Sequence, residues 1–243
     1  MNPDYFIVPD WPAPAHVRAL CTTRCGGVST GAYAGLNLGD HVGDDPLAVA
    51  RNRALLREHL PTEPLWLNQV HGINVAAADC ACGAPQADAG VARRAQAICA
   101  VLTADCLPVL LCDKEGTVVG AAHAGWRGLA AGVIESAIVS MDADPATLLA
   151  WLGPAIGPGA FEVGDEVRAV FLAHDKATAN AFAPHAPGKW LADIYHLARL
   201  RLARSGVTQV YGGDFCTFRE RERFYSYRRD RTTGRMASLI WLD

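Results

Sequence analysis

Three residues near the middle of the chain, two histidines and one cysteine, could bind a transition metal together. They are His71 in NQVHG, Cys106 in TADCLPVLLCD and His123 in AAHAGWRG. A zinc ion accepts imidazole nitrogen and thiolate sulfur as ligands, and a site with only three protein ligands leaves a position free for water or substrate. The three residues therefore suggest a catalytic zinc site and not a structural one.

Each of these residues taken singly has an ordinary structural explanation, because an isolated cysteine is usually a small buried apolar side chain and an isolated histidine is often a core residue. Their places in the sequence favour metal binding. His71 follows the alternating run LWLNQV, Cys106 precedes the apolar run LPVLL, and His123 closes the run TVVGAAH. We expect each residue to lie at the end of a strand, so that the three ligands converge on one rim.

Charged residues near the ligands could also take part in the chemistry. Arg127 stands at the entry of a predicted helix, where free backbone N–H groups favour anions; it could bind phosphate or simply tie the turn. Asp105 could orient a ligand imidazole or cap a turn. Arg53, on a helix predicted over residues 47–60, could hold an anionic substrate group at the rim or be a solvated surface charge.

The composition is that of one large α/β domain spanning residues 1–243. With 243 residues, 51% of them hydrophobic, the chain can bury a sizeable core. Twenty-two basic and 25 acidic residues give a net charge of −3 without a basic stripe, which argues against nucleic-acid binding. Neither a signal peptide nor a membrane span is visible. We expect a soluble cytoplasmic monomer that binds no membrane.

The eight cysteines are expected to be reduced, because a large apolar chain without a signal peptide does not need disulfides to fold. Cys80 and Cys82 form a C-x-C pair that could bind metal. Their Gly/Pro/Asp-rich surroundings are typical of a loop, however, and no second pair stands at zinc-finger spacing. We interpret this pair as a loop feature.

The elements that must position the ligands follow from hydrophobic periodicity. We expect a mixed β-sheet core flanked by helices, and a loop over the site in the irregular Gly- and Asp-rich segment 33–46. Helical spacing appears in residues 129–140, 162–174 and 189–206, and late strands are predicted within residues 207–218 and 238–242.

Longer motifs carry a resemblance over nearly the whole chain. The chain resembles the YfiH-like family, also called laccase-domain or multicopper polyphenol oxidase-like proteins, and particularly its bacterial peptidoglycan-editing-factor branch. The matching stretches are TTRCGGVS, LNLGDHVGD, NQVHG, TADCLPVLLCD, HAGWRGLAAGV, WLGPAIGP, AFEVG, LADIYHLAR, FYSYRRD and TTGRMASLIWL.

This resemblance implies a zinc site at His71, Cys106 and His123. It also implies purine nucleoside phosphorylase activity on adenosine, inosine, guanosine and methylthioadenosine, with phosphate as co-substrate, together with adenosine deamination. Members of this branch are linked to removal of wrongly incorporated amino acids from cell-wall precursors, which implies a UDP-linked precursor as a further partner. The family fold resembles that of a toxin group with cysteine-based deamidase chemistry.

Three other functions stay open. Full multicopper chemistry needs paired His-x-His motifs, which the chain lacks, but two histidines and one cysteine could also bind a single copper ion in a polyphenol oxidase. Alternatively, Cys106 could be the nucleophile and His123 the base of a hydrolase or amidase. A fourth ligand such as Cys80 or His41 would instead favour a non-catalytic, metal-bound interaction module.

Overall fold

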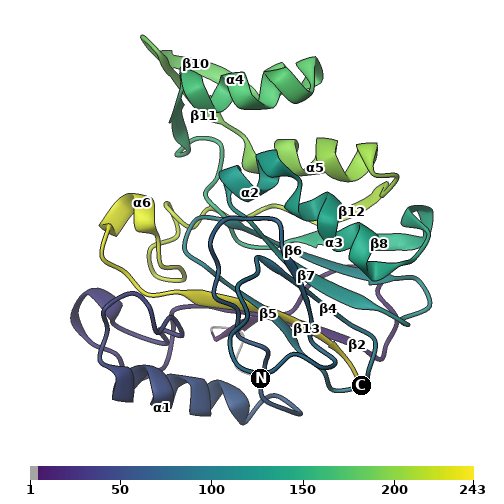
Figure 1. Ribbon diagram of the computed structural model, residues 1–243. Coiled ribbons are helices and arrows are strands. Elements are labelled where there is room, and N and C mark those ends of the chain that lie inside the picture. Colours follow the sequence, from purple (N-terminus) through teal and green to yellow (C-terminus); the bar gives the residue numbers. More distant parts are fainter. Residues whose placement is uncertain (1–4) are drawn as a thin grey trace.

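Two β-sheets packed face to face form the centre of the molecule (Figure 1). The computed structural model describes residues 5–243. The four-stranded sheet contains, in spatial order, β1 (Phe6–Ile7), β2 (Val17–Thr22), β13 (Met236–Leu242) and β5 (Cys99–Thr103). The six-stranded sheet contains β12 (Gln209–Gly212), β8 (Leu148–Leu152), β6 (Leu107–Asp113), β7 (Val119–Ala124), β4 (Ala89–Ala92) and β3 (Val75–Ala77). The six-stranded sheet is mixed, because β12–β8 and β3–β4 are parallel pairs and the others are antiparallel.

Helices cover the outer face of each sheet, which confirms the expected mixed α/β fold. On the four-stranded sheet lies α1 (Pro46–Arg57). On the six-stranded sheet lie α2 (Trp126–Ala131), α3 (Val133–Met141) and α5 (Ile194–Arg204). The remaining helical elements are α4 (Asp165–His174), α6 (Tyr227–Asp230), η1 (Gly31–Tyr33), η2 (Pro145–Thr147) and η3 (Lys176–Ala181). Within residues 5–243, no helix has the length and apolar character needed to cross a membrane.

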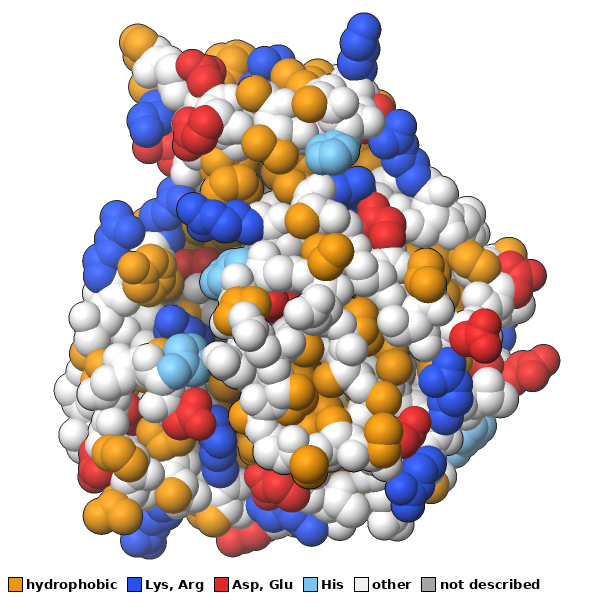
Figure 2. All heavy atoms as spheres, in the orientation of Figure 1, with side chains coloured by type: hydrophobic (Ala, Val, Ile, Leu, Met, Phe, Trp, Pro, Cys, Tyr) orange, Lys and Arg blue, Asp and Glu red, His pale blue; other side chains and the backbone are white. Residues whose placement is uncertain are grey.

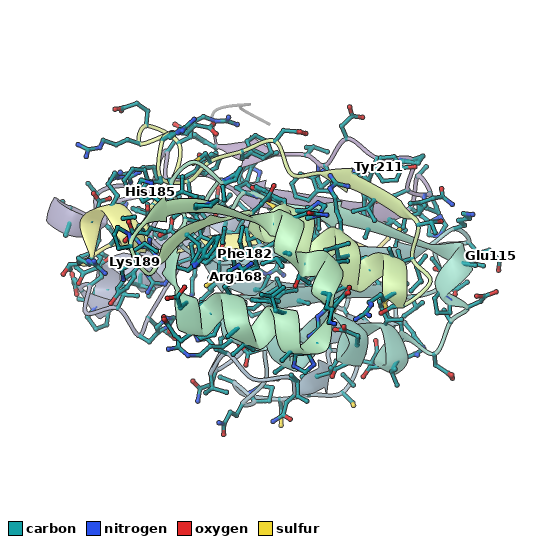
Figure 3. The ribbon with its side chains drawn as sticks, turned by 90° about the horizontal axis from the view of Figure 1, so that it is seen from above. Glu115, Arg168, Phe182, His185, Lys189 and Tyr211 are labelled. Atoms are coloured by element: carbon teal, nitrogen blue, oxygen red, sulfur yellow. The ribbon has the colours of Figure 1, made fainter. Side chains whose placement is uncertain are left out.

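A third, small sheet lies with α4 beyond the helices of the six-stranded sheet. Its strands, in spatial order, are β10 (Phe182–Ala186), β11 (Lys189–Ala192) and β9 (Glu162–Gly164). Seen from above in Figure 3, Phe182 lies near the centre, and His185 and Lys189 lie toward the end of the hairpin. Phe182 and α4 belong to the same apolar cluster as the six-stranded sheet, so this unit packs on the main body.

The continuous apolar runs of the central strands follow from burial on both faces. In β5, Val101 faces the six-stranded sheet, whereas its neighbour Leu102 faces α1. In β6, Leu110 faces the four-stranded sheet, whereas Leu111 faces the helices. Because successive strand side chains point to opposite faces, a strand between two cores must be apolar at every position. The sequence pattern indicated buried strands but not the presence of two facing sheets.

Most predicted elements are present, with shifted ends. The predicted helix over residues 47–60 is α1, where the Asp45 side chain accepts a hydrogen bond from the Leu47 N–H at 3.0 Å. The stretch 129–140 forms parts of two helices, because Gly132 adopts φ 106° and ends α2. Residues 162–164 and 189–192 form strands ahead of α4 and α5.

The strand expected before His71 is wrong. Residues 65–70 form no strand and make only isolated bridges, at Leu65 and Asn68. The Gln69 side chain makes hydrogen bonds to both main-chain groups of Leu102. Its Nε2 donates to the carbonyl at 2.9 Å, and its Oε1 accepts from the N–H at 2.7 Å. A side-chain amide thus replaces the main-chain ladder that a strand would make at this position.

Candidate metal centre

Two neighbouring strands of the six-stranded sheet bring the cysteine and one histidine together. Cys106 directly precedes β6, and His123 is the penultimate residue of β7. The two strands are antiparallel, with Pro108 opposite His123, so the start of one lies beside the end of the other. His71 reaches the same place on the loop that precedes β3, and its Nε2 lies 3.7 Å from the Cys106 Sγ.

The three side chains have the spacing that a metal ion requires. One possible ligand atom from each of His71, Cys106 and His123 lies within 4.8 Å of the others. Tetrahedral zinc with ordinary Zn–S and Zn–N bond lengths places sulfur and nitrogen ligands roughly 3.5 Å apart, close to the 3.7 Å between Cys106 and His71. His71 is exposed, Cys106 is half-buried and His123 is buried. The group could therefore hold a metal that is open to solvent on one side.

A buried carboxylate, that of Asp88, holds two of the ligand-bearing segments in place. It accepts hydrogen bonds from the backbone N–H groups of Val70, His71 and Gly72 at 3.2, 2.9 and 2.6 Å. It also accepts from Nδ1 of His123 at 2.8 Å, which leaves Nε2 of that ring directed at the site. Burial opposes ionisation of Asp88, but these hydrogen bonds outweigh it and lower its pKa.

Two residues at the site have left-handed backbone conformations, which are strained for side chains other than glycine. His71 has φ 60° and Asp105 has φ 95°. Asp88 fixes the first through the hydrogen bonds described above. The Asp105 carboxylate accepts from the Thr217 hydroxyl and the Arg228 backbone N–H, both at 2.6 Å. Asp105 therefore fixes the turn that carries Cys106, and Asp88 is the carboxylate that orients the His123 imidazole.

Gly125 closes the site from the side of α2. A Cβ atom built on it would lie 2.7 Å from Cδ2 of His71 and 2.9 Å from Sγ of Cys106. These distances are shorter than carbon contacts allow, so glycine is needed here for space between the ligands and the helix. The backbone conformation does not itself require glycine, because the φ of Gly125 is an ordinary −61°.

In the metal-free site, Cys106 and His123 carry opposite charges. Burial opposes ionisation of Cys106, but the charge of His123 and hydrogen bonds from both histidines outweigh it and lower the thiol pKa to about 6. Burial likewise opposes a charged His123, but the Cys106 thiolate and Asp88 raise its pKa to about 9. Near neutral pH the two residues therefore form a thiolate–imidazolium pair.

The two arginines singled out from the sequence have different surroundings. Arg127 is exposed, with its guanidinium over the Trp126 ring at 4.4 Å, and it forms no hydrogen bond or ion pair with residues 5–243. Arg53 donates to the Leu38 carbonyl at 3.0 Å, pairs with Asp40 at 3.2 Å and lies over Trp66. Since a carboxylate already compensates Arg53, its role in holding a substrate anion stays a prediction.

The site has no fourth protein ligand within the described part of the chain. Cys80, Cys82 and His41 are exposed, and none of them joins the group of His71, Cys106 and His123. The functional residue that sequence reasoning missed is Asp88, in the stretch APQADAG. Its signal was weak: one acidic residue directly before a short run of small residues that becomes β4.

The fold and the site define a class of protein: a layered, mixed α/β protein with a His-Cys-His group that could hold a metal. The chain belongs to the family described as multi-copper polyphenol oxidoreductase laccase, whose model matches residues 18–243.

Close relatives and solved structures extend over almost the whole chain. A Pseudomonas aeruginosa protein named purine nucleoside phosphorylase is 56% identical over 239 residues, covering 98% of each chain. The Escherichia coli protein named purine nucleoside phosphorylase YfiH is 55% identical, covering 97% of this chain and 98% of its own. A Neisseria meningitidis crystal structure is 55% identical with a TM-score of 0.95, covering 98% of this chain and 99% of its own. YlmD from Geobacillus stearothermophilus is 32% identical with a TM-score of 0.86, covering 96% of this chain and 94% of its own.

Proposed function

We propose that this protein is a zinc-dependent purine nucleoside phosphorylase that also deaminates adenosine. Its substrates would be phosphate and adenosine, inosine, guanosine or methylthioadenosine, and its products the free base and a sugar 1-phosphate. The observation that carries the proposal is the solvent-open group of His71, Cys106 and His123. The group lies in a chain that is 56% and 55% identical to relatives named purine nucleoside phosphorylases.

In phosphorolysis, a phosphate oxygen forms a bond to the anomeric carbon of the ribose. The bond from that carbon to the base nitrogen breaks, and its electron pair moves onto the purine, which takes up a proton. The protein must therefore hold an anion beside the sugar and orient the base. Exposed apolar side chains flank His71, namely Val70 and Ile73, and Tyr227 of α6 is also exposed. Such side chains suit contact with a flat purine ring.

His71, Cys106 and His123 would be the ligands of the zinc ion. Asp88 holds the His123 ring by its Nδ1–H, so that Nε2 can bind metal. When bound, zinc supplies Lewis acidity that makes water a nucleophile near neutral pH, as deamination at the purine carbon requires. The exposed His71 leaves the approach to this position open to a nucleoside.

A cysteine hydrolase or amidase acting on UDP-linked cell-wall precursors is the second candidate. It is favoured by one observation: Asp88, His123 and Cys106 are arranged as carboxylate, base and thiolate nucleophile, with the carboxylate 2.8 Å from the histidine Nδ1. Chelation separates the two functions. A Cys-His catalyst keeps its activity without metal, whereas the proposed phosphorylase loses it.

A copper-dependent polyphenol oxidase is a weaker third candidate. The family description favours it, and copper(II) binds most such sites more tightly than zinc. Residues 5–243 contain, however, one group of three possible ligands and no further group of that kind. An axial methionine is also hard to supply: Met141 is packed in the core, and Met236 accepts a hydrogen bond from the Tyr225 N–H. Met1 lies outside the described residues.

The cellular setting is part of the same proposal. All eight cysteines are free, which fits a reducing compartment, and we propose a cytoplasmic enzyme. We also propose that residues 1–243 act as one laccase-type domain, because α4 and the small sheet share a core with the six-stranded sheet, and that the protein is a monomer.

The deciding experiment supplies purified, zinc-loaded protein with adenosine in the presence and absence of phosphate. We expect adenine and ribose 1-phosphate only when phosphate is present, with inosine appearing in both conditions. Base release that is unchanged without phosphate would identify a hydrolase. No turnover of any purine nucleoside would favour the cell-wall precursor function.

A further inference from the structure

The strand register places one more arginine, Arg235, beside the chain segment that leads to Cys106, and the sequence gave this arginine no role. In the four-stranded sheet, Met236 of β13 pairs with Thr103 of β5. Arg235 directly precedes β13, and Cys106 follows Thr103 by three residues. The chain that enters β13 therefore passes the turn that carries the metal-binding cysteine, and Figure 1 shows it running from α6 into the sheet.

The Arg235 side chain is half-buried and has no carboxylate partner. Its Nη1 donates to the backbone carbonyls of Thr233 and Gly234 at 3.1 and 3.0 Å. Within residues 5–243, no carboxylate lies within 4.0 Å of it, and its Nε and Nη2 make no hydrogen bond to those residues. A half-buried guanidinium is usually paired with an anion, because burial disfavours an uncompensated charge.

The electrostatics agree with this position. Burial lowers the pKa of the Arg235 guanidinium, and the negative charges of Cys106 and Asp105 act against this effect. On the side of the molecule drawn in Figure 2, the surface is hollowed below the position of α6, and basic and histidine side chains lie at the rim of this hollow.

A second observation lies two residues away. The hydroxyl of Thr233 is buried and has no hydrogen-bond partner in residues 5–243, although its backbone carbonyl binds Arg235. Buried hydroxyls are nearly always paired, and an orphan indicates a missing water, ion or ligand. The same short segment thus has a guanidinium edge with two free donors and a hydroxyl without a partner.

We propose that Arg235 and Thr233 form the binding site for inorganic phosphate next to the metal group. The Nε–Nη2 edge of Arg235 is the fork that binds two oxygens of one oxyanion, a geometry that lysine cannot reproduce. The proposal rests on the proposed phosphorolysis, and it makes Arg235 the main anchor of the phosphate. Arg127, which is exposed and stacked on Trp126, contributes less because solvent screens its charge.

The absence of a side chain at Gly39 leaves space for the Arg235 side chain. A Cβ on this residue would lie 2.7 Å from Cγ of Arg235. Gly39 belongs to the loop that the sequence predicted over the site, so this loop packs against the stem of Arg235. Gly39 is in this sense a positioning residue for the phosphate site.

Titration of inorganic phosphate into zinc-loaded protein, without nucleoside, tests the proposal. Arg235→Gln should weaken phosphate binding roughly tenfold or more, because a charge-assisted bond is lost. Arg235→Lys, which keeps the charge but not the fork, should recover only part of that loss. Arg199→Gln is the matched control, because Arg199 is another half-buried arginine whose guanidinium donates to two backbone carbonyls, those of Val210 and Gly212; its phosphate affinity should stay within about twofold of wild type.

The Thr233→Val variant separates a loss of phosphate binding from a loss of protein stability. Removing an unpaired buried hydroxyl should leave the melting temperature unchanged or raise it, while phosphate affinity falls roughly threefold with the lost hydrogen bond. A phosphate Kd that stays within about twofold of wild type in both folded Arg235→Gln and Thr233→Val overturns the site, as does wild-type protein that binds no phosphate.

The two proposals can fail separately. If wild-type protein releases base with phosphate but the Arg235 variants bind phosphate normally, the site is wrong and the function stands. If phosphate binding depends on Arg235 but no nucleoside is cleaved, the site stands and the function is wrong.

Discussion

The Nδ1 nitrogen of His123 lies 2.8 Å from Oδ1 of Asp88, and neither side chain is more than 4% exposed. The backbone carbonyl of Asp88 also accepts the His123 N–H at 2.7 Å. One residue therefore fixes both the main chain and the ring orientation of a proposed ligand. Because the same carboxylate binds the His71 loop, it connects two of the three proposed ligands.

We expect Asp88→Asn to lower zinc affinity by roughly 10- to 100-fold, the range found when a partner of a ligand histidine is lost. The asparagine NH₂ would oppose backbone N–H groups that now donate to the carboxylate. Competition with a fluorescent zinc chelator measures the effect. Asp113→Asn is the matched control, since Asp113 is a buried carboxylate that binds backbone N–H groups of Thr117 and Val118. Equal zinc loss in both variants would contradict a specific role for Asp88.

Cys106→Ala should abolish zinc binding while the far-ultraviolet circular dichroism stays near wild type, because the cysteine lies in a turn and contributes little apolar burial. The zinc content is measured by elemental mass spectrometry, and we expect about one zinc ion per chain for the wild type. Cys112→Ala changes a buried cysteine near the far end of β6, the strand that follows Cys106, and this variant should keep its zinc. Full occupancy in Cys106→Ala removes this residue from the ligand set.

The pH dependence of Cys106 alkylation tests the charge pair of the metal-free protein. The folded pKa is lowered from 9.0 to about 6, so the thiolate is present above that pH and is lost as the pH falls through it. Iodoacetamide labelling of Cys106, followed by peptide mass spectrometry, should rise through pH 6 and be suppressed by added zinc. Cys112 should stay unlabelled, because burial raises its pKa to about 12. A labelling midpoint near pH 9 would show that His123 does not stabilise the thiolate.

Gly125→Ala should weaken metal binding without preventing folding. The added methyl would meet His71 and Cys106 at distances that force one of them to move. Since metal ligation depends on ligand positions within a few tenths of an ångström, we expect at least a tenfold loss of zinc affinity. Gly120→Ala, in the strand β7 that directly precedes Gly125, is the control, because the added methyl would lie 3.4 Å from its nearest atoms. Wild-type zinc affinity in Gly125→Ala would show that the ligands have room to spare.

Local sequence signals predicted three residues that the structure brings together, His71, Cys106 and His123, and most elements that carry them. Cys106 stands before an unbroken apolar run and His123 at the end of another, and such runs are typical of buried strands whatever the rest of the chain does. The helix predicted over residues 47–60 is local in the same way, because Asp45 caps the helix that it precedes and Pro46 begins it. Each of these signals depends only on residues that are close together in the sequence, so it can be recognised without the tertiary structure.

The supporting residues depended on the tertiary structure. Asp88 meets His123 only because β4 pairs with β7 in one register, with Ala89 opposite Ala122. Arg235 lies beside the chain that leads from β5 to Cys106 only because β13, at the end of the chain, inserts between β2 and β5. Pairing between segments distant in sequence is set by how two sheets and their helices bury their apolar faces together. The sequence by itself therefore determined which atoms could bind a metal, and the packing of the sheets decided which neighbours orient, crowd and charge them.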